Sequence, residues 1–239
     1  MRKLLAILLL SPLFGLSQTQ NIVHVDRVFA KQDKGDQLEK AIAAHAKKYH
    51  SGSWSWRVYE VQTGPDAGAL QLNEGPNTWT VLDGRGDLGA EHTADFNNTV
   101  ATFTIDRGSS GYNKYDADLS TTGLTDYTDK VILQHIYPKP GMVDRVRDML
   151  MRSKKAWQSA KVDIAVYESI ISGPPSFTIA RRLKNGLKDM EESSGPSFKD
   201  SWNKVYGANA YDKYQKDYAE MVESRWSELI VYRPDLSSK

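Results

Sequence analysis

The sequence predicts an α+β fold made of two tandem copies of one β-α-β-β-α-β unit. Two observations support this prediction: segments in the two halves of the chain read alike, and strand-like and helix-like patterns follow in the same order in each half. The clearest match is Val58-Tyr59-Glu60 with Val166-Tyr167-Glu168. Either half is long enough for only one compact unit of strands and helices. Self-similarity over a whole unit is the sequence signature of a repeated structure.

Further matches between the two halves follow in the same order along the chain. They are Val28–Lys31 with Ile136–Lys139, Tyr49 with Trp157, Gly64-Pro65 with Gly173-Pro174, and Trp79–Leu82 with Phe177–Ala180. The register shifts between these matches fall in turn-like sequence, where insertions are tolerated. One tripeptide could match by chance, but a collinear series of strand, helix, strand, turn and strand indicates a duplication.

In the first half, residues 22–31 alternate and are rich in valine, which predicts a strand. Residues 35–49 place apolar side chains on one stripe with charged residues opposite, which predicts an amphipathic helix. Residues 54–62 and 78–83 are predicted strands, the first ending at a Gly-Pro turn and the second at Gly84.

The fourth strand of the first half is not obvious from the sequence. Either residues 119–127 supply it, despite Gly123 and few β-branched residues, or the aromatic and Gly-rich stretch 97–129 departs from the repeat. The second half is clearer. Its predicted strands are residues 130–137, 163–171, 176–181 and 227–232, and its predicted helices are residues 142–157 and 210–223.

This order of strands and helices is the split β-α-β arrangement called ferredoxin-like. Two such units in one chain resemble the dimeric α/β-barrel superfamily in its tandem form, in which two four-stranded sheets pack face to face into a barrel. The segment Tyr137-Pro-Lys-Pro-Gly-Met142, leading from a strand into a helix, is similar to the strand-to-helix entry of that superfamily. The expected organisation is a first repeat over residues 21–129, a second over residues 130–233 and a tail at residues 234–239.

The first residues have the pattern of a signal peptide. Arg2-Lys3 precedes an apolar run over residues 4–16, and small residues at the end of the run suit cleavage before Gln18. The run is shorter than the roughly 20 residues that a membrane-spanning helix needs, and no later segment is apolar enough to stay in a bilayer. We therefore expect residues 1–17 to be removed from an exported protein, periplasmic or extracellular, without an integral membrane segment.

Charge and composition exclude several classes of protein. Setting residues 1–17 aside changes the formal net charge from +1 to −1, and the remaining Lys and Arg are interleaved with Asp and Glu. A nucleic-acid-binding protein would carry a clustered basic surface, so no nucleic-acid partner is expected. The chain has no cysteine, which excludes disulfides, thiolate nucleophiles and Cys-type zinc sites. Stability must therefore come from core packing.

Functional side chains are expected where the duplicated strands face each other. Period-two alternation places Arg27 on one face of the first strand, and His135 and Tyr137 on the equivalent face in the second half. Glu60 and Glu168 occupy matched positions on the next strand of each half. These five residues are the predicted ligand-binding candidates, and no catalytic residue is assigned.

Two interpretations of these candidates stay open. Buried charge is costly unless it is paired or solvated, so an Arg, a His and two carboxylates inside a barrel would imply mutual ion pairs or a wet ligand cavity. In the alternative, Glu60 and Glu168 pair with Lys or Arg of a helix at a strand edge.

The resemblance also implies possible cofactors. The superfamily includes cofactor-free monooxygenases, haem-dependent enzymes of the chlorite dismutase type and haem-degrading enzymes. Haem binding needs at least a proximal histidine, and His135 is the best placed of the five histidines. His45 lies on the apolar stripe of a helix and is expected in the core. His24, His50 and His92 have no partner at metal-ligand spacing, so no metal site is predicted.

The expected function is therefore binding of a small molecule in or beside the cavity between the repeats of an exported protein. One alternative is a haem-dependent or cofactor-free oxidoreductase, such as a monooxygenase. Another is a structural or interaction module that associates through its sheet edges. Whether the protein is an enzyme is left open by the sequence.

Overall fold

A computed structural model describes residues 19–85, 88–191 and 194–238. The predicted signal peptide, residues 1–17, lies outside these ranges. Within them, no helix combines the length and the apolar character needed to cross a membrane.

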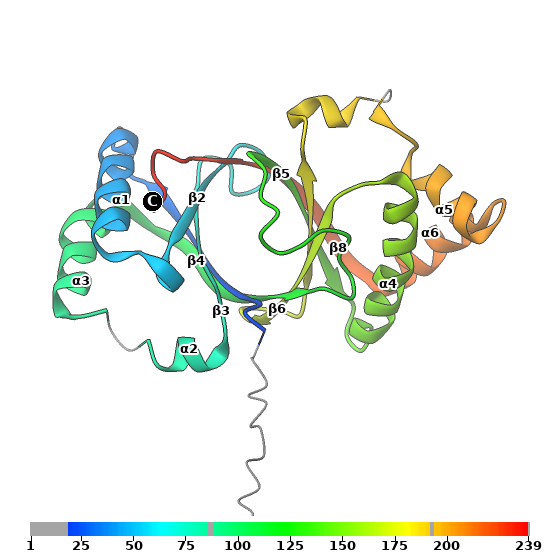
Figure 1. The fold of residues 1–239 in the computed structure, drawn as a ribbon, viewed down its shortest axis with the longest axis horizontal. Helices are drawn as coiled ribbons and strands as arrows, with labels where there is room; N and C mark the ends of the chain where they lie inside the picture. Colours follow the sequence, from blue (N-terminus) through cyan, green and yellow to red (C-terminus); the bar gives the residue numbers. More distant parts are fainter. Residues whose placement is uncertain (1–18, 86–87, 192–193, 239) are drawn as a thin grey trace, which may run out of the picture.

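The described part of the chain contains eight strands, four from each half. They are β1 (Ile22–Ala30), β2 (Trp56–Val61), β3 (Leu70–Asn77), β4 (Thr104–Asp116), β5 (Lys130–Pro138), β6 (Ile164–Ile171), β7 (Phe177–Leu183) and β8 (Val222–Tyr232). The strands close into one barrel in the order β1-β3-β2-β8-β5-β7-β6-β4 (Figure 1). The first half therefore has the internal order β4-β1-β3-β2 and the second has β8-β5-β7-β6. This equivalence confirms the predicted pair of tandem ferredoxin-like repeats.

Two antiparallel seams join the repeats into a barrel. At one seam β2 pairs with β8, with Tyr59 opposite Tyr232. At the other, β4 pairs with β6, with Tyr115 opposite Tyr167. Closure matters for function because the inward faces of both sheets then surround one interior, and the described strands leave no open sheet edge.

Helices cover the outside of the barrel on both sides (Figure 1). The first repeat carries α1 (Gly35–Tyr49), α2 (Trp79–Asp83) and α3 (Ala90–Asp95), and the second carries α4 (Val143–Ala160), α5 (Phe198–Tyr206) and α6 (Ala210–Met221). Short 3-10 or π turns lie at Gly52–Trp54, Phe96–Val100, Ala101–Phe103 and Gly186–Met190. Helix α1 has the bounds that the sequence predicts, because its apolar stripe is regular from end to end.

The residues that the structure describes form three apolar cores. In the first repeat, Leu38 and Ile42 of α1 pack against Val58 and Leu72 of the sheet. In the second repeat, α4 packs in the same way against β5, β6 and β7. The third core lies inside the barrel and includes Leu133. Complete burial of a Leu or Ile side chain contributes about 1.5–3 kcal/mol, so the two outer cores hold the helices to the sheets.

The third strand of the first half lies earlier than the sequence predicts. Residues 78–83 do not form a strand: β3 is Leu70–Asn77, and α2 follows it. The Thr78 side chain accepts a hydrogen bond from the Val81 amide at 3.1 Å and so caps the helix. The β3 pattern is hard to detect because Gln71 and Asn73 replace apolar residues on its inward face.

The fourth strand of the first half is neither of the predicted alternatives as stated. β4 occupies Thr104–Asp116, pairing with β1 on one side and β6 on the other. Gly108 is required there, since a Cβ atom at this position would lie 2.6 Å from the Arg27 carbonyl oxygen. At Gly111 an added Cβ would clash with the Ser172 Cβ, so both glycines of β4 allow close neighbours, and this composition hides the strand in the sequence.

Candidate functional site

The barrel interior contains a cavity of about 380 Å³. This volume lies within the range of roughly 300–1,000 Å³ typical of small-molecule sites. The wall consists of alternate residues of the strands, because successive side chains of a strand point to opposite faces. Its apolar and aromatic part includes Val25, Tyr59, Leu133, Tyr167 and Trp226. Such a wall can enclose an aromatic or aliphatic ligand.

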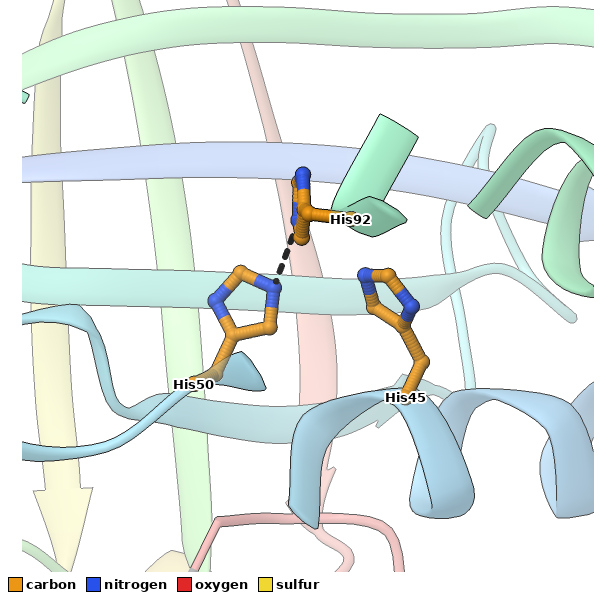
Figure 2. Close-up of side chains that lie close together, drawn as sticks. All are labelled: His45, His50 and His92. Atoms are coloured by element: carbon orange, nitrogen blue, oxygen red, sulfur yellow. Dashed lines mark hydrogen bonds between the residues drawn. The ribbon is translucent and has the colours of Figure 1, made fainter. Parts of the chain in front are cut away.

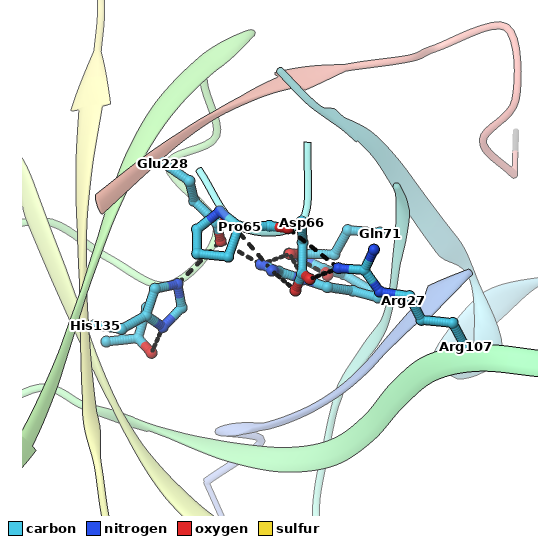
Figure 3. A network of polar contacts seen from close by, with 9 residues as sticks. Arg27, Pro65, Asp66, Gln71, Arg107, His135 and Glu228 are labelled. Carbon is cyan, nitrogen blue, oxygen red and sulfur yellow. Dashed lines mark hydrogen bonds and ion pairs between the residues drawn. The ribbon is translucent and has the colours of Figure 1, made fainter. Parts of the chain in front are cut away.

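One polar network at the wall centres on Glu228 (Figure 3). Arg27 donates through Nη1 to Glu228 Oε2 at 3.1 Å and through Nη2 to Glu228 Oε1. His135 Nε2 lies 2.9 Å from Glu228 Oε1, and the Thr178 hydroxyl lies 3.1 Å from His135 Nδ1. A consistent assignment has His135 donating to the carboxylate and accepting from Thr178.

Charges in this network are balanced inside the protein. The Glu228 side chain is 0% exposed and that of Arg27 is 8% exposed, so neither charge is compensated by bulk water. Burial alone lowers the pKa of Arg27, but the carboxylates of Glu228 and Asp66 outweigh it and hold the pKa above its ordinary value. Arg27 Nη2 also donates a hydrogen bond to Gln71 Oε1 at 2.7 Å. The Arg27 guanidinium is therefore a fixed cation whose charge is balanced by the carboxylates of Glu228 and Asp66.

The structure brings some of the predicted candidates together and separates others. Arg27, His135 and Tyr137 line the cavity, and Glu228 joins the first two. The carboxylates of Glu60 and Glu168 lie on the other face of their strands, so the expectation that they face the interior requires correction.

The placement of these two carboxylates has a simple physical reason. Glu168 Oε2 lies 3.3 Å from Nη1 of Arg147 on α4, and Glu60 Oε2 lies 3.6 Å from Nη1 of Arg233. Their neighbours Tyr59 and Tyr167 take the inward positions, because only alternate residues of a strand can face the interior.

Sequence reasoning missed Glu228, although a signal for it was present. Trp226, Glu228 and Ile230 alternate along β8, and Trp226 and Ile230 line the cavity. A carboxylate between two large apolar residues of the same face indicates an inward position that needs a cationic partner. Arg27, an isolated cation on an apolar face, is that partner.

A second polar group at the wall contains two arginines, Arg57 and Arg182. The Arg57 guanidinium lies 3.9 Å from the centre of the Tyr127 ring and 4.0 Å from that of Tyr232. Arg182 donates to the backbone carbonyls of Gly123, Leu124 and Asp126. Among the described residues, no carboxylate forms an ion pair with either arginine. This part of the cavity can therefore accept an anion.

Nearby phenols do not supply the missing negative charge. Tyr167 lines the same cavity, and burial raises the pKa of its hydroxyl to about 12. It therefore stays neutral at physiological pH. The polar character of this part of the wall is set by Arg57 and Arg182.

Haem ligation by His135 does not fit the geometry. Both ring nitrogens of His135 are engaged, Nε2 with Glu228 and Nδ1 with Thr178. His135 is also the one histidine of the described chain that lines the cavity. A haem iron needs an unprotonated imidazole nitrogen directed at it, whereas the unprotonated Nδ1 of His135 is directed at the Thr178 hydroxyl.

Three other histidines gather outside the barrel, on the outer side of the first sheet. The expectation that His50 and His92 have no partner at metal-ligand spacing is wrong: one ring nitrogen of each, together with one of His45, lies within 4.8 Å of the others (Figure 2). They come from the end of α1 and from α3. Only the fold brings these elements together.

Neither a protein-family model nor a curated protein sequence matches the chain. Solved structures do match it over almost its whole length. An anthrone oxidase-like protein has a TM-score of 0.58 at 10% identity, with 90% of this chain and 92% of that chain covered. A mutant chlorite dismutase from Candidatus Nitrospira defluvii has a TM-score of 0.54 at 10% identity, with 92% and 94% covered.

A proposed monooxygenase from Lactobacillus acidophilus NCFM gives a similar result, with a TM-score of 0.52 at 11% identity and with 91% of this chain and 95% of that chain covered. At such low identity these likenesses establish the fold alone. Together with the strand order, they show that this chain has the fold of the dimeric α/β-barrel superfamily, with both ferredoxin-like repeats on one polypeptide.

Proposed function

We propose that the protein binds a small aromatic molecule bearing an acidic group in the barrel cavity. The observation that carries this proposal is the pair Arg57 and Arg182, which line the cavity without an ion-pair partner among the described carboxylates. Guanidinium groups form charge-assisted, often bidentate hydrogen bonds with carboxylates. An acidic ligand would balance the charges of Arg57 and Arg182, as Glu228 balances the charge of Arg27.

The rest of the wall supports an aromatic ligand. Tyr59, Tyr127 and Tyr167 surround the two arginines, and the cavity volume suits a ligand of one or two rings. Arg57 stacks on Tyr127 and Tyr232, which fixes the position of its guanidinium at the wall. The wall can therefore hold the ring of a ligand while Arg57 and Arg182 hold its acidic group.

Binding of two probes of equal shape tests the proposal. 1-Naphthoic acid is ionised at pH 7, whereas 1-naphthamide is neutral, and calorimetry gives both affinities. We expect the acid to bind more tightly than the amide and to lose about tenfold in affinity in Arg57→Gln. Arg145→Gln, an exposed arginine with a 3.9 Å contact to Glu220, is the matched control. Equal affinities of acid and amide, or an unchanged affinity in Arg57→Gln, would contradict the proposal.

A second candidate is cofactor-free oxygenation, supported by the His135–Glu228 pair in the cavity wall. A buried carboxylate that accepts a hydrogen bond from an imidazole makes the imidazole a stronger base, as in other general bases. Nδ1 of His135 would take a proton from an acidic CH₂ group of an aromatic ketone through the Thr178 hydroxyl, which lies 3.1 Å from Nδ1 and lines the cavity. Dioxygen then converts that CH₂ to C=O and leaves one water. Two of the fold neighbours are a proposed monooxygenase and an anthrone oxidase-like protein.

Oxygen uptake with dithranol, an anthrone, tests this candidate. We expect uptake above the uncatalysed rate, lowered about 100-fold in His135→Gln and unchanged in His24→Gln, a histidine outside the network. Uptake equal in the wild type and in His135→Gln would exclude His135 as the base.

Association through sheet edges, in contrast, gains no support because the strands close into a barrel.

We also propose that the protein is exported, on the basis of the signal-peptide pattern of residues 1–17. Expression of the full gene in a bacterial host and intact-mass measurement of each cell fraction test this. The expected product starts at Gln18 and lies outside the cytoplasm. Recovery of the chain in the cytoplasm with residues 1–17 attached would contradict the proposal.

A further inference from the structure

The cluster of His45, His50 and His92 is a second site, separate from the barrel cavity. His45 lies on α1, His50 caps the end of that helix and His92 belongs to α3. Figure 2 shows the three rings turned toward a common centre. His50 Nε2 lies 3.3 Å from His92 Nε2, and one nitrogen of each ring is within 4.8 Å of the others.

These separations suit a shared metal ion. A zinc–nitrogen bond of about 2.0–2.1 Å in tetrahedral geometry places two ligand nitrogens roughly 3.3–3.4 Å apart. The His50–His92 distance of 3.3 Å has this value. The widest separation in the cluster, 4.8 Å, would close by about 1.5 Å on metal binding. Side-chain rotation can supply that movement without a change of fold.

Two carboxylates hold the rings from behind. His45 Nδ1 lies 2.8 Å from Asp95 Oδ2, and His50 Nδ1 lies 3.1 Å from Glu74 Oε2. Metal-binding histidines commonly donate their second ring N–H to a carboxylate, which fixes the tautomer and directs the other nitrogen at the ion. Both rings are thus held with Nε2 toward the cluster centre. Glu74 is itself fixed by the Trp56 indole N–H at 3.3 Å.

Burial gives a further reason to expect an ion. His45 is 1% exposed and His50 is 2% exposed. His45 Nε2 is a buried nitrogen without a hydrogen-bond partner, which costs free energy in an otherwise satisfied interior.

We propose that Nε2 atoms of His45, His50 and His92 bind one divalent transition metal ion, with Zn²⁺ as the representative. Three imidazole ligands suit Zn²⁺, Co²⁺, Ni²⁺ or Cu²⁺. They do not suit Ca²⁺ or Mg²⁺, which need several oxygen ligands. Three protein ligands leave a fourth position for water or a small molecule, which is the ligand count of catalytic zinc sites. His92 is only partly buried, so the open position is expected on its side.

The site is independent of the proposed ligand-binding function. Glu74 and Trp56 lie on the outer face of their strands, whereas Gln71 and Asn73 of the same sheet line the cavity. The two sites are on opposite faces of the first sheet. Metal binding and aromatic-anion binding can therefore fail or succeed separately.

Titration with Zn²⁺ tests the proposal. The protein carries no oligohistidine tag and is first dialysed against EDTA to remove bound metal. We expect calorimetry to give one Zn²⁺ per chain. Co²⁺ should give the intense visible absorption of four-coordinate cobalt. His92→Ala is expected to weaken Zn²⁺ binding by about 100-fold or more, and Asp95→Asn by about tenfold through loss of the second-sphere bond. His24→Ala, a histidine bonded to Ser110 outside the cluster, should bind as the wild type does.

Far-UV circular dichroism of each metal-free variant separates a loss of ligand from a loss of fold. The wild-type cobalt spectrum is a second readout that needs no variant. Wild-type binding below one ion per chain, or only the weak spectrum of hydrated Co²⁺, would overturn the proposal. So would equal Zn²⁺ affinities in folded His92→Ala and in the wild type.

Discussion

His135 Nε2 lies 2.9 Å from Glu228 Oε1, and the same carboxylate receives two hydrogen bonds from Arg27. Arg27 and His135 occupy matched positions on the first strand of each repeat. A duplicated scaffold therefore brings two different side chains to one carboxylate, which belongs to the second repeat only. In the second repeat, Glu228 of β8 lies opposite Leu133 of β5. In the first repeat, the residue opposite the matched Val25 of β1 is Gly111 of β4. The asymmetry of the cavity arises from such replacements on a symmetric barrel.

Replacement of Glu228 should strongly destabilise the fold. In Glu228→Gln the buried Arg27 loses its closest counter-charge, and breaking a buried ion pair costs about 3–5 kcal/mol. Urea denaturation gives the free energy of unfolding. Glu168→Gln removes a partly exposed ion pair with Arg147 and should cost no more than about 1 kcal/mol. Similar losses in the two variants would show that the Arg27–Glu228 pair is not a buried structural pair.

Two glycines should respond in opposite ways to an added methyl group. In Gly108→Ala the new Cβ would meet the Arg27 carbonyl oxygen at 2.6 Å, so β1 and β4 must separate, at a cost of about 1–3 kcal/mol. In Gly35→Ala nothing lies within 4 Å. This helical position should gain about 0.4–1 kcal/mol. Thermal unfolding of both variants is the measurement, and a neutral Gly108→Ala would refute the close β1–β4 approach.

Arg182 should hold the loop between β4 and β5 in a way that lysine cannot. Its guanidinium donates to the carbonyls of Gly123, Leu124 and Asp126, and a lysine lacks the planar fork that reaches several acceptors. Arg182→Lys is expected to lose about 1–3 kcal/mol and to become more sensitive to proteolysis in that loop. Arg181→Lys is the adjacent control, since Arg181 donates a hydrogen bond to a single backbone carbonyl of the described residues, that of Asp189. Equal proteolysis of the two variants would contradict this role.

Stability should fall when the metal-free protein is acidified from pH 7.5 to pH 5.5. Burial lowers the pKa of His45 in the folded state, with the nearby charges of His50 and Lys48 adding to the effect and Asp95 opposing it. The unfolded chain therefore binds more protons in this range. The contribution is complete above the unfolded pKa of about 6.5 and is lost as the pH falls toward the folded value.

The slope from this one group is at most about 1.4 kcal/mol per pH unit. Urea denaturation in EDTA at several pH values measures it, and His45→Gln should have a shallower slope because Gln does not titrate. A slope that is equal in His45→Gln and in the wild type would exclude His45 as the source of the pH dependence.

Regular patterns made much of the fold predictable. The valine-rich alternation of residues 22–31 and the apolar stripe of residues 35–49 identified β1 and α1. The repeat then placed the same elements in the second half. β3 and β4 did not follow these patterns, because Gln71 and Asn73 face a polar cavity and Gly108 meets a neighbouring backbone.

The site was predictable only where local alternation sufficed. Arg27, His135 and Tyr137 were assigned to the right face, since each follows the period of its own strand. For Glu60 and Glu168 the sequence left two placements open, facing the cavity or pairing with a basic residue outside it, because their strands carry large side chains on both sides. The partners of Arg27 and His135 come from a strand far along the chain, which no local pattern can supply.

The duplicated β-α-β-β-α-β architecture could be predicted from the chain, because repeated elements and periodic apolar residues are local properties. Which side chains meet depends on the folded barrel. Barrel closure brought Glu228 to Arg27 and His135, and the packing of α3 beside α1 brought His92 to His45 and His50. Charges and lone pairs interact over a few ångströms, so such sites depend on distances that the order of residues does not contain.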